Sequence, residues 1–583
     1  MELKAQIQQE ISQYLTETVS IGENYQYSQY RLIRRIILFE NHIYPSGKWD
    51  SQGNYKYWFD IITPRIDAEV KNIDFDTKDV DVTSDRKDDA LACLICNLRL
   101  KEYMRTTGQA EEINSAIEEG SGWGNVVWKM VKGGYERMDL KNFYPVNITA
   151  PTLGRTGANE RYEMSASELQ EKSGVWKYTD EVIKNCRSNT YKRVADDLPV
   201  NTTTPFYEIY ERNGEVCLAD LKRVNGETPK KSDENKYVLA KIVAAGKSSM
   251  NNVTIDYIMF AEELKELPYQ EFHRSRYKGR WFREGLYELL FDVQVRLNQI
   301  GNQIAQGLEF ASKTLFQSED RLVVQNVLTD LQNGDIIKTK GISHVPVRME
   351  GFDQLANEWN RLIQLADSIA NSQEVVQGEN LPSGTSFRLG NLLNSNANKL
   401  FDFIREKLAI PLSEMFERWI IPELVKDLKV KDILRLTGDS EMLARLNQII
   451  VDNWYIDNLV EIGPHTPEIA EALKQEKMDE LKSRTELMMV GIKKLFKDFY
   501  PSASVVITGE NSNKPSELQT LATFINLEMD PVRRTGLIEK AMRRQGVDVG
   551  GLPKSPPAPL PSPQPIQAQR EPAPAQRAAQ NVV

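Results

Sequence analysis

The closely spaced cysteines are the first residues whose type and spacing could do chemistry. Cys93-Leu94-Ile95-Cys96 has the spacing of half a zinc site or of a redox dithiol. A structural zinc site needs four ligands, however, and the remaining cysteines, Cys186 and Cys217, stand far apart. Four scattered cysteines are also too few for a disulfide framework. We therefore expect free thiols, as in a protein made in a reducing cytoplasm, and no metal ion.

The histidines are the other candidates for metal binding or acid–base catalysis. They lie in four separate segments, and none belongs to a metal-ligand or Ser-His-Asp pattern. No catalytic residue and no cofactor is predicted at any of the four, which are His42, His273, His344 and His465.

A glycine cluster, Gly120-Ser121-Gly122-Trp123-Gly124, could suggest a phosphate-binding loop. Such loops lead from a strand into a helix whose N-terminus faces the anion. Here the order is reversed, since a helical pattern precedes the cluster and a strand-like run, residues 126–131, follows it. A nuclease or helicase would need a phosphate loop or a carboxylate cluster with metal spacing. We find neither pattern, so we do not expect an enzyme, and a nucleic-acid enzyme is the least supported alternative.

The densest basic stretch, residues 273–283, alternates basic with aromatic side chains. Such a pattern can stack on and pair with nucleic acid. The alternatives are ion pairs with the carboxylates of a neighbour, or capping of the helix that begins next to it. We favour a role between subunits for Arg274, Arg276, Lys278 and Arg280. The other basic candidates, Lys338 and Lys340, could face DNA, although solvent exposure is the default for so sparse a charge.

The chain that must position these residues is too long for one core. Its 583 residues suggest several packed units at roughly 100–200 residues per domain. A hydrophobic share of 40% and a charged share of 27% support a folded core without disulfides or metals. The net charge of −10 argues against tight DNA binding, because affinity for a duplex depends on Lys and Arg. Any DNA in contact with this protein should slide.

No apolar run is long enough to cross a membrane, and the N-terminus lacks the apolar core of a secretion signal. Residues 1–45 and 88–118 have helical patterns, and another helix is expected from Trp58. Four strand-like runs follow in the middle third, at residues 207–212, 216–219, 237–244 and 254–260. The predicted fold class is α+β and predominantly α-helical.

From residue 284 the pattern changes to long helices. Apolar residues recur at spacings of mostly four and three through residue 315, which predicts a helix of roughly thirty residues, about 45 Å long. Gly301 and Gly307 each cost this helix about 1 kcal/mol relative to Ala, so a neighbouring helix should approach closely there. We expect the apolar stripe to pack between subunits through Leu290, Val293, Leu297, Ile300, Gly301, Ile304 and Leu308.

A small α/β insert, residues 319–351, separates this helix from a second one with near-heptad spacing, residues 352–371. The insert is predicted to hold a short helix at 321–332 and short strands at 335–340 and 344–349. Residues 372–398 are rich in Gly, Ser and Asn, and a helix kinked by Pro411 follows and should end near Pro422. Further helices and one strand, 504–508, precede a Pro-rich tail, residues 552–583, which should be disordered.

This order of elements resembles the portal proteins of tailed double-stranded DNA bacteriophages. Four stretches carry the likeness: residues 60–67, 267–269, 279–298 and 382–386. The resemblance implies a portal-type fold with a wing (1–283), two stem helices (284–318 and 352–371), a clip (319–351), a tunnel-loop region (372–398) and a helical C-terminal wing and crown (399–551). Its tunnel-loop candidates would be Gln377, Glu379, Asn380, Ser383 and Thr385.

The resemblance also implies partners. About twelve copies would form a ring at one capsid vertex of the virion, assembled in the host cytoplasm. The clip would engage the large terminase subunit during packaging and head–tail adaptor or tail proteins afterwards. The major capsid protein, and a scaffold if there is one, would surround the ring, and DNA would pass through its channel without tight binding. Another head–tail connector or assembly component is the main alternative.

Overall fold

The fold is described from a computed structural model. The structure describes residues 3–20, 26–50, 53–76, 79–84, 89–188, 192–194, 198–200, 206–249, 252–312, 315–317, 343–345, 351–370, 387–427, 447, 451–452, 454–455, 458, 467–483 and 501–507. All of these belong to one compact unit, Met1–Ser512.

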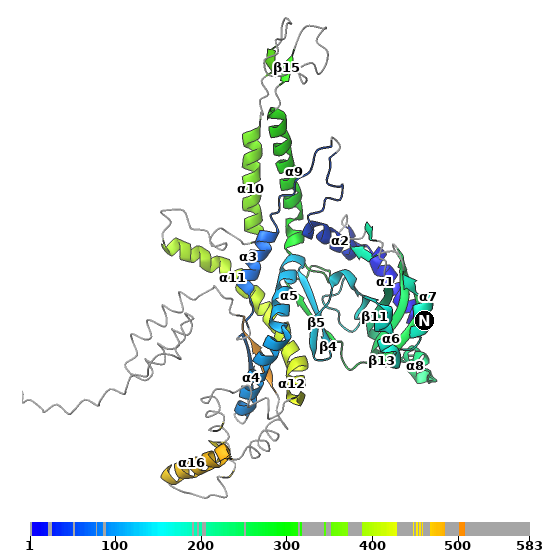
Figure 1. Ribbon diagram of the computed structural model, residues 1–583, viewed down its shortest axis with the longest axis vertical. Helices are drawn as coiled ribbons and strands as arrows, with labels where there is room; N and C mark the ends of the chain where they lie inside the picture. The colour runs from blue at the N-terminus through cyan, green and yellow to red at the C-terminus, as the bar shows by residue number, and fades with distance from the viewer. Residues whose placement is uncertain are drawn as a thin grey trace, which may run out of the picture. The chain divides into compact units, whose positions relative to one another are not determined.

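A six-stranded antiparallel sheet forms the centre of the N-terminal half (Figure 1). Its strands lie in the order β13 (Asn252–Glu263), β12 (Tyr237–Ser249), β11 (Phe206–Cys217), β7 (Ala158–Met164) and β6 (Phe143–Pro145), with β8 (Arg187–Ser188) also paired to β11. Helix α1 (Leu3–Thr16) packs on this sheet through residues spaced at four, four and three, namely Leu3, Ile7, Ile11 and Tyr14. That spacing places one apolar stripe on the sheet.

A second, three-stranded sheet lies beside the first. Its order is β14 (Tyr269–His273), β4 (Asn125–Val131) and β5 (Gly134–Arg137). Helices α3 (Thr63–Ile73), α4 (Ala90–Thr107) and α5 (Gln109–Trp123) share hydrophobic clusters with these strands. The small sheet formed by β3 (Val80–Thr83) and β17 (Ser502–Val505) completes the cluster on the side of α4.

Two long helices pack side by side, α9 (Leu286–Ser312) and α10 (Phe352–Ala370) (Figure 1). Between them in sequence, β15 (Leu315–Gln317) pairs with β16 (Ser343–Val345). Helix α11 (Phe387–Met415) contains Pro411 and continues through a π-helical turn, Phe416–Ile420, into α12 (Ile421–Asp427). Helix α2 (Gln29–Glu40) packs on α9.

The remaining described elements are short or peripheral. They are β1 (Val19–Ser20), β2 (Gln26–Tyr27), α6 (Ala166–Glu171), α7 (Thr179–Asn185), β9 (Lys192–Val194), β10 (Leu198–Val200), α8 (Leu218–Asn225), α16 (Pro467–Ser483) and three 3-10 turns, Leu140–Asn142, Lys172–Gly174 and Lys231–Asp233.

The expected mixture of helices and sheets is confirmed, but several boundaries were wrong. The pattern at 88–118 forms two helices, because Gly108 adopts a left-handed conformation between them. The glycine cluster continues α5 up to the left-handed Gly124. Residues 218–219 begin helix α8 instead of a strand. The helix expected to end near Pro422 runs on to Asp427, because proline is tolerated in the first turn of a new helix.

Gly124 lies where two backbone segments cross closely. A Cβ at this position would lie 2.5 Å from the Arg283 carbonyl oxygen and 2.6 Å from the Gly285 nitrogen, and its φ is +92°. We expect Gly124→Ala to lower the midpoint of thermal unfolding well beyond the effect of Gly133→Ala. Gly133 has a similar φ of +90° but open space around it, so that control carries only the cost of the left-handed conformation, about 1–2 kcal/mol. Equal midpoints for the two variants would contradict the crossing.

Candidate functional site

An extended segment of the N-terminal part of the chain, residues 57–61, lies along α9. Three amide side chains of α9 accept hydrogen bonds from alternate backbone N–H groups of this segment: Asn302 from Tyr57 at 2.7 Å, Asn298 from Phe59 at 2.9 Å and Gln294 from Ile61 at 3.0 Å. The Gln294 and Asn302 amide nitrogens donate back to the Phe59 and Tyr57 carbonyls at 2.6 and 3.0 Å. We call these three side chains the amide ladder.

The geometry of the amide ladder follows from two periodicities. Four residues of α-helix rise about 6 Å, and two residues of extended chain span about 6.6 Å. Amides at every fourth helical position can therefore bind every second residue of a strand. The ladder satisfies backbone groups that no neighbouring strand binds, and it sets the register of residues 57–61 on α9.

Gly301 is required where this segment passes between α9 and α10. The ring of Phe59 meets the ring of Trp359 edge to face, with 5.1 Å between centroids. A Cβ on Gly301 would overlap the Phe59 ring and would lie 2.8 Å from Trp359. The close approach of an adjacent helix expected at Gly301 is therefore confirmed, and it occurs within one chain.

Arg65 on α3 binds the other long helix. Its guanidinium donates to the Ile61 carbonyl at 2.6 Å and to the Asp367 carboxylate of α10 at 2.6 Å, and the side chain is buried. Charge-assisted hydrogen bonds of this kind are stronger and more directional than neutral ones. Arg65 and the amide ladder together fix both long helices to the same short segment.

The expected packing stripe on α9 lies largely inside the single chain. Leu290, Leu297 and Ile300 are fully buried, Val293 is buried, and Ile304 packs against the same core. Only Leu308, with 52% of its surface exposed, is available to a neighbour. These buried side chains form intramolecular contacts, so a contribution from this set to a subunit interface stays a prediction for Leu308.

Most of the candidate residues in the basic stretch form ion pairs within the chain. Arg274 forms two hydrogen bonds of 2.7 Å with Glu69, and Arg280 forms two of 2.8 Å with Glu288. Both guanidinium groups are buried. Lys278 is exposed and pairs with Glu284 at 2.6 Å, and Arg276 is exposed. A neighbouring subunit could thus reach Arg276 and Lys278. Arg274 and Arg280 instead fix the residues that lead into α9, through their ion pairs with Glu69 and Glu288.

The other candidate residues fall outside the described part of the chain. These are Lys338 and Lys340 of the insert, the tunnel-loop candidates Gln377, Glu379, Asn380, Ser383 and Thr385, and His465. The helix expected at 321–332 and the tail from residue 552 also lie outside it.

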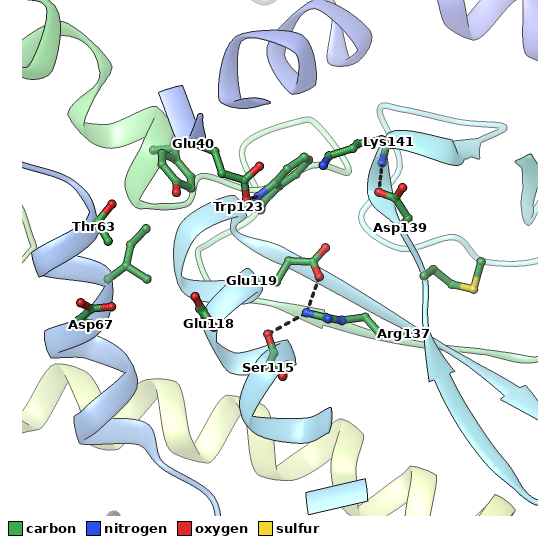
Figure 2. Close-up of a pocket in the computed structure, with 13 residues that line it drawn as sticks. Glu40, Thr63, Asp67, Ser115, Glu118, Glu119, Trp123, Arg137, Asp139 and Lys141 are labelled. Carbon is green, nitrogen blue, oxygen red and sulfur yellow. Dashed lines mark hydrogen bonds and ion pairs between the residues drawn. The ribbon is translucent and has the colours of Figure 1, made fainter. Parts of the chain in front are cut away.

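A cavity of about 460 Å³ opens between α3, α5 and β5, and its lining includes five carboxylates and two basic side chains (Figure 2). Arg137 crosses it, donating to Glu119 at 2.8 Å and to the Ser115 carbonyl at 2.8 Å. Burial raises the pKa of Glu119 to about 7, although the charge of Arg137 opposes this shift. Trp123 forms one wall and donates to Glu40 at 3.3 Å. Glu119 can therefore take up a proton near neutral pH. The surplus of carboxylates over basic side chains in the lining favours cationic groups.

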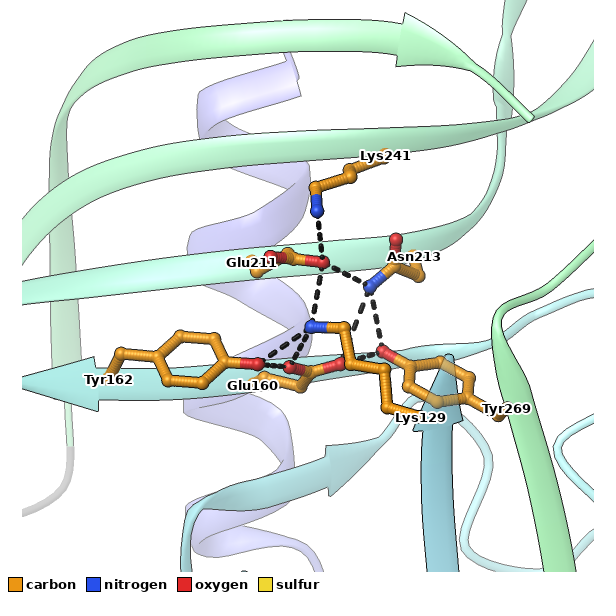
Figure 3. A network of polar contacts seen from close by, with 7 residues as sticks. All are labelled: Lys129, Glu160, Tyr162, Glu211, Asn213, Lys241 and Tyr269. Carbon is orange, nitrogen blue, oxygen red and sulfur yellow. Dashed lines mark hydrogen bonds and ion pairs between the residues drawn. The ribbon is translucent and has the colours of Figure 1, made fainter. Parts of the chain in front are cut away.

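A second polar cluster joins the two sheets (Figure 3). Lys129 of β4 lies 2.6 Å from Glu160 of β7 and 2.9 Å from Glu211 of β11. Tyr162 and Tyr269 both donate to Glu160. Burial lowers the pKa of Lys129, but Glu160 and Glu211 outweigh it and raise that pKa, while burial raises the pKa of Glu160 to about 7. The ion pairs of Lys129 with Glu160 and Glu211 hold the two sheets together. Lys129 and Glu160 are buried, so the cluster offers no access to a substrate.

The remaining chemical candidates occupy ordinary structural positions. Cys93 and Cys96 are buried in α4 as free thiols, and burial raises the pKa of Cys96 to about 12. His42 pairs with Asp60 at 3.3 Å, and His273 with Glu271 at 3.2 Å. Across the described residues no group of three His, Cys, Asp or Glu side chains could hold a metal ion. None of the described helices is long and apolar enough to span a membrane.

Sequence reasoning missed the amide ladder and the two charged clusters. The ladder had a signal, because Gln294, Asn298 and Asn302 recur at four-residue spacing on an otherwise apolar face of a helix. The charged clusters had none, since residues such as Lys129 and Glu160 stand 31 positions apart in sequence, on strands of different sheets. Only the folded chain brings these partners together.

The first prediction from this site concerns the amide ladder. We expect Asn298→Leu to destabilise the protein by about 1–3 kcal/mol, because the Phe59 N–H loses its acceptor at nearly constant side-chain volume. Hydrogen exchange should accelerate in the peptide covering residues 57–61. The matched control is Gln299→Leu, an exposed amide on the same helix. Unchanged exchange at residues 57–61 in Asn298→Leu would show that the ladder does not hold this segment.

The second prediction concerns Glu119. A carboxyl whose folded pKa is raised from 4.5 to about 7 makes the native state bind more protons than the unfolded state between these values. Stability should therefore fall as pH rises from 4.5 to 7, by about 3 kcal/mol in total for such a shift. Glu119→Gln should remove this fall and be more stable than the wild type at pH 8.

Thermal unfolding midpoints at pH 5 and pH 8 test this prediction. The matched control is Glu118→Gln, which changes an exposed carboxylate of the same cavity. Parallel pH profiles for the wild type and Glu119→Gln would contradict a raised pKa at Glu119.

No protein-family model matches this chain, and no curated protein matches its sequence.

Proposed function

We propose that this chain is the portal protein of a tailed double-stranded DNA bacteriophage, a ring-forming structural protein and not an enzyme. The observation that carries the proposal is the pair of long helices α9 and α10, packed side by side and separated in sequence by residues 313–351, a stretch in which β15 pairs with β16. A mixed body of helices and sheets precedes them, and helices α11 and α12 follow. This is the order of wing, stem, clip and C-terminal wing in portal proteins.

The surfaces of the two helices support a role in a ring lined by polar groups. The side chains of α9 that point away from the core are mainly polar, with Asp292, Arg296, Gln299 and Gln303 exposed. Helix α10 likewise exposes Asp353, Asn357, Asn360 and Gln364. Polar and weakly charged helix faces suit both a wet subunit interface and a channel past which DNA slides.

The charge of the whole chain supports the same reading. A net charge of −10 disfavours retention of phosphate, because tight duplex binding requires a surplus of Lys and Arg. The basic residues that the sequence concentrates before α9 are mostly neutralised by Glu69, Glu284 and Glu288. We infer that DNA is conducted and not held.

In the proposed assembly about twelve copies form the ring at one capsid vertex of the virion. The insert, residues 319–351, forms the clip that engages the large terminase subunit and later the head–tail adaptor or tail proteins. The major capsid protein, and a scaffold where one exists, contact the outer wing. Another head–tail connector is the alternative that the same helix pair would suit.

The oligomeric state tests the proposal. Mass photometry and negative-stain imaging of the purified chain should show rings of about twelve subunits with a central channel wide enough for duplex DNA. Rings without such a channel would favour another connector. A stable monomer at every concentration, including in the presence of capsid and scaffold proteins, would overturn the proposal.

A pair of leucine variants separates assembly from folding. We expect Leu308→Asp, at an exposed position of α9, to raise the concentration needed for ring formation about tenfold, which is roughly 1.4 kcal/mol, with unchanged thermal unfolding. Leu297→Asp replaces a fully buried side chain and should unfold the core instead. Normal assembly of Leu308→Asp would show that this face of α9 lies outside the interface.

A further inference from the structure

A short aromatic hairpin next to α9 exposes three large aromatic side chains to solvent. We define it as residues 44–50 and 53–57 of the loop between α2 and α3. Trp49 is 62% exposed, Tyr55 45% and Tyr57 52%. Their rings form a continuous row with centroid distances of 5.4 Å from Trp49 to Tyr55 and 5.5 Å from Tyr55 to Tyr57. Exposed aromatic rows of this kind are typical of protein interfaces.

The aromatic hairpin is rigid before any partner binds. Trp49 and Tyr55 pair as a backbone bridge, and the Asp50 carboxylate accepts hydrogen bonds from the Asn54 backbone and side chain at 2.7 and 3.2 Å. The Tyr44 hydroxyl donates to the Tyr57 carbonyl at 2.7 Å. A surface that is already ordered loses little conformational entropy on binding, so its exposed rings can contribute most of their burial to affinity.

The hairpin is anchored on the face of α9 that points away from α10. Asn302 binds Tyr57, and Gln306 donates to Asp50 at 2.8 Å. Ile304, two residues from each anchor, belongs to the core shared with α10. Two residues along a helix correspond to about 200° of rotation, so the two anchors of the hairpin lie on the side of α9 opposite Ile304. Phe59, which follows the hairpin, reaches Trp359 of α10. Figure 1 shows the dark blue loop on one side of α9 and α10 on the other.

The exposed face of α10 is complementary to the aromatic hairpin in charge and chemistry. The hairpin carries Lys48 and Lys56 against the single Asp50, whose oxygens are occupied by Asn54 and Gln306. On α10, Asp367 is bound by Arg65 and Glu358 pairs with Arg361, so the exposed Asp353 is the carboxylate that Lys48 or Lys56 of the hairpin could approach. It also exposes Asn357 and Leu365, which offer an amide to aromatic hydroxyl or indole groups and an apolar contact to their rings.

We propose that the aromatic hairpin of one subunit docks on the exposed face of α10 in a second copy of this chain. The inference rests on the proposed function, because it names the partner of the long helices in the ring. The aromatic hairpin and the exposed face of α10 are two different surfaces of the chain, so their contact is heterologous. Such a contact repeats from copy to copy and closes into a ring when the rotation permits. The hairpin thus supplies the apolar contact that the buried stripe of α9 cannot supply.

Photo-crosslinking of the full-length chain tests this contact. Trp49→p-benzoylphenylalanine is assembled from equal amounts of isotopically labelled and unlabelled chain, and crosslinked peptides are identified by mass spectrometry. We expect mixed-label crosslinks between position 49 and peptides of residues 352–370. Crosslinks confined to one label, or mixed-label crosslinks to other segments, would overturn the docking while leaving the ring intact. If the wild-type chain forms no ring, the proposed function itself fails, and the two failures are distinguishable.

Alanine variants give a second, independent measurement. Trp49→Ala and Tyr55→Ala should each raise the concentration for ring formation about tenfold, which is roughly 1.4 kcal/mol. Tyr237→Ala is the matched control, since Tyr237 is 62% exposed on β12, away from the hairpin. Equal effects of Tyr237→Ala and Trp49→Ala would overturn the proposal. Binding of fluorescent single-stranded DNA by the wild type that is lost in Trp49→Ala, with assembly unchanged, would assign the aromatic row to base stacking and overturn it as well.

Discussion

The structure depends on one requirement, that the backbone of an extended segment crossing the core must find hydrogen-bond partners. Residues 57–61 have no neighbouring strand in the described sheets, and the amide ladder of α9 takes its place. Once the ladder fixes the register, Phe59 must lie over position 301, and only glycine leaves room for its ring beside Trp359. Arg65 follows within the same run of chain and binds α10 through Asp367. The mutual position of the two long helices is therefore specified from the N-terminal part of the chain.

This arrangement changes what the apolar stripe of α9 does. A long amphipathic helix in a ring-forming protein invites the interpretation that its stripe packs between subunits. In this fold the stripe completes the core of one subunit, where Leu290 and Leu297 are fully buried. In the proposed ring, contacts between subunits would then use polar helix faces, the aromatic hairpin and exposed apolar groups such as Leu308. Such an interface resembles those of proteins that fold first and associate afterwards, because each monomer already has a complete core.

The periodicity of apolar residues in the sequence predicted those elements that depend on local interactions. The spacing of apolar residues gave both long helices, and α10 begins at the expected Phe352. It could not give the start of α3 at Thr63, because the extended state of residues 57–61 is imposed by side chains more than 230 positions away. The helix boundary at Gly108 was missed for a different reason, since a single glycine inside a helical pattern is as compatible with a continuous helix as with a left-handed break. The buried partners of Arg274 and Arg280 were likewise decided by tertiary structure.

The buried charges have a role that burial of apolar surface cannot fill. Replacing a buried ion pair with apolar side chains often costs little stability, so pairs such as Arg274–Glu69 and the Lys129 cluster are weak evidence for stability alone. They do impose geometry, because an unpaired charge in the core is far more costly than a slightly misplaced leucine. The Lys129 cluster fixes one sheet against the other, and Arg274 fixes the end of β14 against α3. In the proposed ring of about twelve copies, a small error in each subunit would accumulate around the circle. Directional contacts that reject misalignment are therefore worth more to such a protein than their net free energy indicates.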